Sequence, residues 1–243
     1  VQTCALPISG LRNGRRRIRQ GHAVSARAPI LPMYQALVGV GALAGLLIAV
    51  VFSITAPVIE RNRAEALERA VFAVLPEAST RRTYGFDEAG GLRPVDAADI
   101  VAGGQGRLHA AFDEAGRLVG VAIEASGMGY ADTISLLYGY APAREAIVGM
   151  RVLASRETPG LGDRIESDPA FLENFEALAV PLNAAGDDLA HSITTVKAGS
   201  KTEPWQIDGI TGATVSSQAV GEILADSTAR WLPRLAGGLD ALA

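Results

Sequence analysis

The chain has 243 residues, of which 49% are hydrophobic and 5% aromatic, and its formal net charge is −4. This length accommodates one domain of good size together with additional segments. A net negative chain has no global basic field that would attract nucleic acid, so no nucleic-acid partner is expected. Cys4 is the only cysteine, which excludes a disulfide framework and a cysteine metal site within one chain.

The N-terminal segment, residues 1–33, is basic. Residues 1–10 begin with Val rather than Met and resemble non-native sequence, so the fold is interpreted without them. Basic clusters next to apolar segments are typical of membrane proteins. The arginines that form this cluster are Arg12, Arg15, Arg16, Arg17, Arg19 and Arg27.

An uncharged apolar run follows, from Ala28 to Ile59. A helix needs ~20 residues to cross the ~30 Å hydrocarbon core of a bilayer, and the run predicts one transmembrane helix over residues 34–57. A buried core helix is one alternative, and a cleavable signal peptide with a weak cleavage site at Ser53–Ala56 is another. Since the arginines precede the run, the positive-inside rule places the N-terminus in the cytoplasm and the chain after Pro57 outside.

Residues 58–110 are expected to form a helix and a variable connection. Apolar residues at helical spacing predict an amphipathic helix over 58–75, which Pro76 ends. This helix is either a stalk above the membrane or the first helix packed on the following domain. Residues 77–110 are polar and rich in glycine, and they carry no recognisable chemistry.

From residue 111 to residue 235 the pattern predicts one α+β, or mixed α/β, domain. Turn residues between β-rich runs indicate strands, and an aspartate followed by proline is a favourable helix start. In chain order, we expect a β-hairpin over 111–123 with its turn at Asp113–Gly116, a strand over 146–153, a helix opened by Asp168 and Pro169 with an apolar face of Phe171, Leu172, Phe175 and Leu178, a strand over 193–196, and a last helix from near Ser216.

A turn-rich segment, residues 206–217, runs directly into this last helix. The unpaired N–H groups and the positive dipole end of a helix start favour a phosphate. Small residues would let a ligand approach the backbone closely, and hydroxyl side chains would supply hydrogen-bond donors. An ordinary capped helix is the alternative interpretation. The small residues are Gly209, Gly212 and Ala213, and the hydroxyl residues are Thr211, Thr214, Ser216 and Ser217.

Within this segment, Asp208-Gly-Ile-Thr-Gly-Ala-Thr214 resembles the flavinylation motif of the FMN-binding domain family. In that family a flavin transferase joins the FMN phosphate to the last threonine as an ester, so the resemblance implies covalent FMN on Thr214. It also implies that Asp208 orients the loop, or binds a metal in the active site of the transferase. The residues that it places around the phosphate and the ribityl chain are Thr211, Gly212, Ala213 and Ser217.

A second motif lies upstream. Glu157-Thr-Pro-Gly-Leu-Gly162 by itself could be a plain turn. It resembles, however, the signature loop shared by the G subunit of Rnf-type ion-translocating complexes and the C subunit of the Na⁺-translocating NADH:quinone oxidoreductase. The family places this loop beside the isoalloxazine ring, which implies ring contacts from Glu157, Thr158, Leu161 and Gly162. Lys197, between the motifs, either offsets phosphate charge or is a solvated surface residue.

The two motifs in this order resemble the G subunit of an Rnf-type complex. The resemblance implies an electron-transfer subunit that carries FMN in the bacterial inner membrane, with its C-terminal domain on the periplasmic side. Its partners would be the other subunits of the complex and a flavin transferase. No catalytic residue and no metal site is expected, since His22, His109 and His191 lack ligand spacing. A stand-alone anchored flavoprotein, a cofactor-free anchored binding module and the C subunit itself are the alternatives.

Overall fold

The computed structural model describes residues 30–86, 92–94 and 107–239. The chain divides into two compact units, residues 1–56 and 57–243. The basic cluster expected before the apolar run and parts of the expected connection lie outside the described residues.

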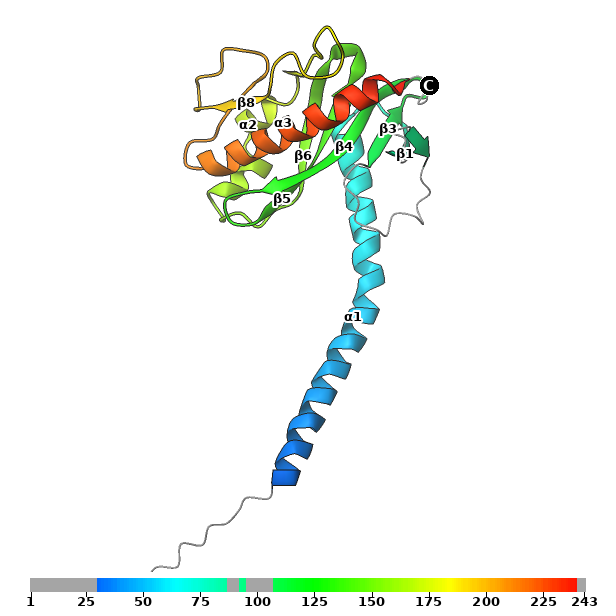
Figure 1. The fold of residues 1–243 in the computed structure, drawn as a ribbon, viewed down its shortest axis with the longest axis vertical. Helices are drawn as coiled ribbons and strands as arrows, with labels where there is room; N and C mark the ends of the chain where they lie inside the picture. Colours follow the sequence, from blue (N-terminus) through cyan, green and yellow to red (C-terminus); the bar gives the residue numbers. More distant parts are fainter. Residues whose placement is uncertain (1–29, 87–91, 95–106, 240–243) are drawn as a thin grey trace, which may run out of the picture. The chain divides into compact units, whose positions relative to one another are not determined.

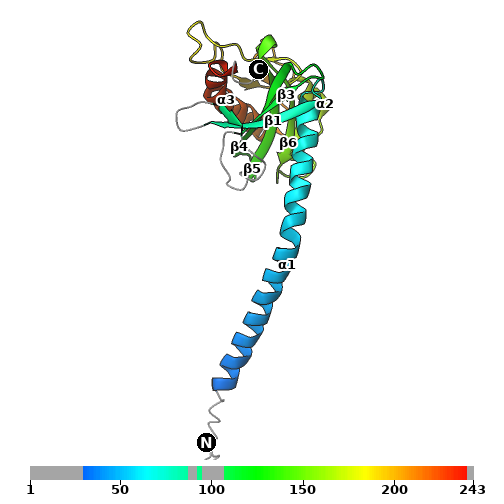
Figure 2. The same cartoon turned by 90° about the vertical axis from the view of Figure 1, so that its right-hand side faces the viewer.

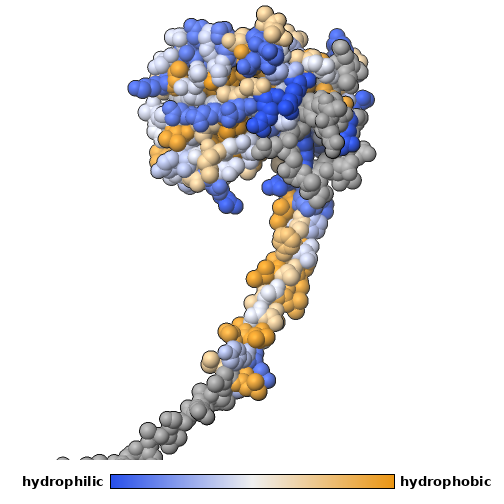
Figure 3. Space-filling model, viewed as in Figure 1, coloured by the Kyte–Doolittle hydropathy of each residue, from blue (hydrophilic) through white to orange (hydrophobic). Residues whose placement is uncertain are grey.

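Helix α1 (Ile30–Val74) is one continuous helix of 45 residues. It covers both the segment expected to cross the membrane and the amphipathic helix expected after it, and Pro57 lies inside it without ending it. Every residue from 31 to 55 is exposed, and apolar side chains gather along this part of the helix (Figure 3). By length and composition α1 can cross a membrane.

The second unit contains a seven-stranded sheet in the order β2-β1-β3-β4-β5-β6-β7 (Figure 1). All neighbouring strands in it are antiparallel. The expected hairpin is confirmed, with its turn at Asp113–Gly116 and a positive φ of 76° at Gly116. The strands are β1 (Thr80–Phe86), β2 (Leu92–Pro94), β3 (Leu108–Phe112), β4 (Leu118–Met128), β5 (Thr133–Ala141), β6 (Ala146–Ala154) and β7 (Leu178–Ala179).

The sheet begins earlier than the sequence pattern indicated. Strand β1 lies in the segment expected to be a connection, and it forms because its backbone pairs with β3 from Thr80↔Phe112 to Tyr84↔Leu108. Strand β5 was not expected either. It is buried on both faces over most of its length, and a central strand of this kind lacks the alternation that marks a half-buried strand.

One helix expectation needs correction. Helix α2 (Pro169–Glu173) begins as expected, with the Asp168 carboxylate accepting from the Phe171 N–H, but it ends before Leu178. Leu178 lies in β7, where it pairs with Ile147 of β6, so sheet pairing replaces a further helical turn. Helix α3 (Thr214–Ala236) confirms the last expected helix, since it begins two residues before Ser216.

Helix α3 lies across one face of the sheet (Figure 1). Its buried side chains, which include Val220 and Leu224, pack in one apolar cluster with Ile123 of β4 and Leu136 of β5. The remaining elements border this layer: the short 3₁₀ helices η2 (Pro142–Arg144) and η3 (Gly162–Glu166), and the parallel pair β8 (Thr194–Val196) and β9 (Gln206–Asp208).

The end of α1 packs on the opposite face of the sheet, as Figure 2 shows. Val71, Val74 and Leu75 are buried there in a second cluster with residues of β3, β4 and β5. The sheet presents glycines to this helix end: a Cβ at Gly149 would lie 2.8 Å from Val74 Cα, and one at Gly139 would lie 2.7 Å from the Val74 carbonyl oxygen. The helix backbone therefore sits directly on the strands.

Candidate functional site

Three segments from distant parts of the sequence meet at the N-terminal end of α3. They are the end of β4 with the following residues to 132, the segment 157–164 that leads into η3, and the segment 210–217 that enters α3. Hydrogen bonds join each of them to another. The two motifs of the sequence are thus brought together.

The entrance to α3 is a tight turn over residues 210–213. The Ala213 N–H donates to the Ile210 carbonyl (3.0 Å), and Gly212 has a φ of 87°, which glycine adopts at no steric cost. The Ser217 hydroxyl is fully buried, accepts from the Ile210 N–H and donates to the Ala213 carbonyl. Ser217 therefore fixes the turn from inside, while Thr211 and Gly212 are exposed.

Thr214 is the first residue of α3, a helix of 23 residues, and it is exposed. Within the described part of the chain, its hydroxyl makes no hydrogen bond, and the N–H groups of Thr214, Val215 and Ser216 have no acceptor. An exposed hydroxyl therefore stands among unpaired donors at the positive end of a helix dipole. This arrangement suits a phosphate group.

The upstream motif folds as a turn whose shape its own residues dictate. The Leu161 N–H donates to the Thr158 carbonyl (3.1 Å), and Gly160 has a φ of 78°. Proline followed by glycine at the two central positions is typical of a type II turn. The turn leaves Thr158 and Leu161 exposed, whereas Gly162 is buried against the start of α3.

Glu157 is 5% exposed. Its Oε2 accepts from the Ser216 hydroxyl (2.5 Å), and its Oε1 accepts from the Ala131 N–H (3.0 Å). Burial raises the pKa of this carboxyl, but hydrogen bonds from Ser216 and from the N–H groups of residues 130–132 outweigh burial and hold the pKa below its ordinary value. The carboxylate is therefore ionised at neutral pH, and both of its oxygens accept hydrogen bonds from groups of the protein.

Asp208 and Lys197 lie at the ends of the two strands of the small β8–β9 sheet. Asp208 is the last residue of β9. Its Oδ1 accepts hydrogen bonds from the N–H groups of Ser200 and Lys201 (both 3.0 Å). Lys197 follows β8 and is exposed. The Asp208 carboxylate therefore holds the turn that follows Lys197.

Two residues that the sequence did not single out hold these segments in place. The buried Asn174 side chain bonds both the N–H and the carbonyl of Asp208 (3.0 and 3.2 Å). The Arg164 guanidinium donates to the Thr211 carbonyl (3.1 Å) and pairs with the Asp168 carboxylate (2.5 Å). Neither residue lies in a recognisable motif, so only the structure could reveal them.

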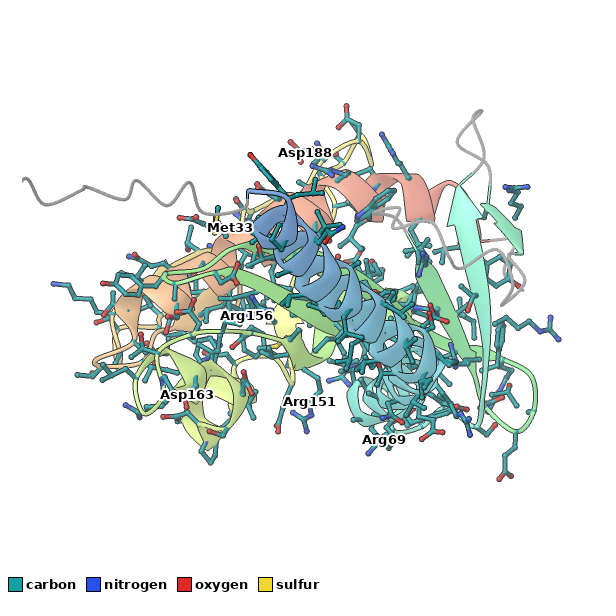
Figure 4. All side chains as sticks on the ribbon, turned by 90° about the horizontal axis from the view of Figure 1, so that it is seen from below. Met33, Arg69, Arg151, Arg156, Asp163 and Asp188 are labelled. Atoms are coloured by element: carbon teal, nitrogen blue, oxygen red, sulfur yellow. The ribbon has the colours of Figure 1, made fainter. Side chains whose placement is uncertain are left out.

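Arg156 and Asp163, which precede and follow the upstream motif in the sequence, are labelled in Figure 4. Arg156 pairs with Asp132 at 3.4 Å, so a second, exposed contact joins the residues after β4 to this segment. Asp163, in η3, has one buried carboxylate oxygen without a hydrogen-bond partner in the described part of the chain.

Exposed large apolar side chains gather in these same segments. In the described part of the chain beyond α1, the large apolar side chains that are exposed are Met128, Tyr130, Leu161 and Val215, at 50 to 73%. The hydrogen-bond partners of Glu157 are Ala131 and Ser216. Met128 and Tyr130 lie within three residues of Ala131, and Val215 lies next to Ser216. Leu161 lies four residues after Glu157. Clustered exposed apolar groups are typical of binding surfaces.

Comparison with known proteins identifies the family. The FMN-binding domain family matches residues 129–228, a stretch that contains both motifs. The G subunit of the ion-translocating oxidoreductase complex of Methanosarcina acetivorans is 30% identical over 188 residues, which cover 77% of this chain and 87% of that protein. This chain belongs to the G-subunit family of ion-translocating oxidoreductase complexes.

Further comparisons support the family and the fold. The G subunit of Pseudomonas aeruginosa (strain UCBPP-PA14) is 32% identical over 200 residues, which cover 76% of this chain and 78% of that protein. The crystal structure of NqrC from Shewanella oneidensis has the same fold, with a TM-score of 0.55 at 18% identity over 75% of this chain and 98% of that chain. The expected mixed α/β domain after an apolar helix, and the resemblance to the G subunit, are confirmed.

Proposed function

We propose that this member of the G-subunit family carries FMN on Thr214 through a phosphoester and transfers electrons within a membrane complex that couples electron flow to ion translocation. The observation that carries the proposal is the exposed Thr214 hydroxyl at the start of α3: among the residues that the structure describes, neither this hydroxyl nor the N–H groups of the first turn have a hydrogen-bond partner. When bound, FMN supplies the exchange of one or two electrons.

The residues present fit this cofactor. The free N–H groups at the start of α3 can receive phosphate oxygens, and exposed apolar side chains near them can cover one side of an aromatic ring. Thr211, Gly212 and Ala213 adjoin the phosphate and ribityl chain, with Ser217 supporting them from inside the turn. Thr158, Leu161 and Gly162 adjoin the ring, and Lys197 offsets phosphate charge.

We further propose the membrane arrangement and the partners. Helix α1 anchors the chain with a single span, and the arginines before it keep the N-terminus in the cytoplasm. The domain that bears Thr214 then lies on the periplasmic side, where a covalent bond retains FMN that would otherwise diffuse away. The partners are the other subunits of the complex and, during maturation, a flavin transferase.

In-gel fluorescence tests the attachment. The full chain is co-expressed with a flavin transferase, and its band is examined for flavin fluorescence after denaturing electrophoresis. We expect a fluorescent band that Thr214→Ala abolishes. Thr194→Ala, which removes an exposed hydroxyl from β8, is the matched control and leaves the band unchanged.

Two results would contradict the proposal. Fluorescence that persists in Thr214→Ala would place the flavin elsewhere. A dark wild-type band beside a fluorescent reference substrate of the same transferase would remove the covalent cofactor and favour an anchored binding module.

A further inference from the structure

One buried carboxylate joins all three segments of the site. Glu157 belongs to the upstream motif, its Oε2 accepts from Ser216 in the first turn of α3, and its Oε1 accepts from Ala131 after β4. These partners neighbour Tyr130 and Val215, two of the exposed apolar side chains, while Leu161 lies four residues after Glu157 on the same turn. In the described part of the chain beyond α1, the contacts of Glu157 thus link the segments that bear exposed large apolar side chains.

The enclosure around this carboxylate is tight. A Cβ at Gly129 would lie 2.4 Å from Glu157 Oε1, and a Cβ at Gly162 would lie 2.7 Å from Glu157 Oε2 and equally close to Ser216 Oγ. A side chain at either position would displace the Glu157 carboxylate or its partners. Gly129 and Gly162 therefore leave the space that the Glu157 carboxylate occupies.

The groups that face this carboxylate favour an anion. An ionised carboxylate only accepts hydrogen bonds, and the groups that face it here are donors: the Ser216 hydroxyl and the N–H groups of residues 130–132. Bonds of this charged type are roughly twice as strong as neutral ones. A glutamine of the same shape could accept from the backbone N–H groups and donate its NH₂ group to the Ser216 hydroxyl, but these bonds would be neutral and therefore weaker than those of the carboxylate.

We propose that Glu157 is a positioning residue for the flavin: by fixing Tyr130, Leu161 and Val215 relative to Thr214, it determines where the ring rests once FMN is joined to Thr214. This inference rests on the proposed function. Glu157 acts through the protein, because its carboxylate oxygens are already engaged by Ser216 and by the backbone after β4.

The test compares the full chain with Glu157→Gln, Ser216→Ala and the double variant, each co-expressed with a flavin transferase. Glu173→Gln, which changes an exposed glutamate of α2, is the matched control. Four quantities are measured: flavin on the denatured band, thermal midpoint, fluorescence anisotropy of the native flavin, and its reduction potential.

We expect Glu157→Gln and Ser216→Ala to keep the flavin on the denatured band. Both variants should lower the anisotropy of the native flavin and shift its potential in the same direction, because Glu157→Gln removes the charge of the contact and Ser216→Ala removes the contact itself. The double variant should change no more than the larger single one, because both substitutions act on the same contact. Glu173→Gln should match the wild type in all four quantities.

Wild-type anisotropy and potential in a flavin-bearing Glu157→Gln chain would overturn this inference and leave the proposed function intact. A change in thermal midpoint alone would also overturn it, since that result describes a purely structural residue. If Glu157→Gln does not fold, Ser216→Ala decides the question by the same readouts. A wild-type chain without covalent flavin would overturn the proposed function itself, and this inference with it.

Discussion

The two faces of the central sheet are covered in different ways. On one face, α3 packs through large apolar side chains such as Val220 and Leu224 against Ile123 and Leu136. On the other face, the end of α1 rests its backbone on glycines, with Val74 within 2.8 Å of where a Cβ of Gly149 would lie. Side chains can shift rotamers to absorb a change, whereas a backbone contact cannot, so the α1 face should be the less tolerant of added volume.

The two faces of the sheet also have different roles. The α3 face holds the helix whose first turn carries Thr214, so its packing sets the site. The α1 face holds the helix end that connects the domain to the apolar segment, so its close contact sets how firmly that end is attached. Each of the following changes probes one side of this comparison.

The largest effect is expected for Leu224→Ala on the α3 face. Leu224 is fully buried, and the substitution removes apolar contacts and leaves a cavity, which costs about 3 kcal/mol of unfolding free energy. Urea denaturation of the detergent-solubilised chain measures it, with Gln218→Ala, an exposed change on the same helix, as control. A loss similar to that of the control would show that α3 is not held by side-chain packing.

A smaller effect separates the faces directly. Gly149→Ala places a methyl group 2.8 Å from the Cα and carbonyl oxygen of Val74, whereas Gly127→Ala places one 2.6 Å from a side-chain carbon of Ile223. We expect a loss of about 2–3 kcal/mol for Gly149→Ala and about 1 kcal/mol for Gly127→Ala, because the isoleucine can move and the backbone cannot. Urea denaturation measures both losses. Equal losses of unfolding free energy would show that the two faces tolerate added volume equally, contrary to the comparison.

The smallest effect concerns a polar pair on the α1 face. Strand alternation places His109 and Glu124 on that face, and their side chains lie 3.1 Å apart. The hydrogen bond from His109 lowers the pKa of Glu124, against the opposing effect of burial, and the charges of His109, Arg107 and Arg63 add to the lowering. Because the folded pKa lies below the unfolded one, this stabilisation is present above about pH 4.3 and is lost as the pH falls through the folded pKa.

Glu124→Gln should therefore reduce the unfolding free energy at pH 7 by less than about 1 kcal/mol, since the pair is partly exposed. The difference from wild type should shrink as the pH falls below about 4, where the unfolded carboxyl is protonated. Thermal unfolding across this pH range measures it, with the exposed Glu114→Gln as control. If the stability difference between Glu124→Gln and wild type grew as the pH fell, the folded pKa of Glu124 would lie above its unfolded value, and the lowered pKa would be contradicted.

The sequence predicted elements whose signals are local. The hairpin turn at Asp113–Gly116, the cap at Asp168 and the proline–glycine turn after Thr158 are each specified by a few adjacent residues, so they could be recognised. Strand β1 could not, because it exists through its pairing with β3. The apolar run before Pro57 and the helical spacing after it were also local signals, and α1 runs through this proline as one helix.

The same distinction holds for the site. Motif residues such as Thr214 and Leu161 could be named from the sequence, and the structure places them at one end of α3. The inward direction of the Glu157 and Ser217 side chains was not predictable, because it depends on partners 59 and 7 residues away. Asn174 and Arg164 belong to no motif and contribute through contacts over 34 and 47 residues.

Peptide mapping tests the covalent attachment of FMN most directly. The full chain is purified from membranes of cells that contain a flavin transferase, and it is cleaved with trypsin. Lys201 and Arg230 bound a peptide that contains Thr214, and fragmentation locates any added mass within it. We expect an FMN phosphoester on Thr214. Flavin mass on another residue, or an unmodified peptide in a flavin-containing preparation, would contradict the attachment at Thr214.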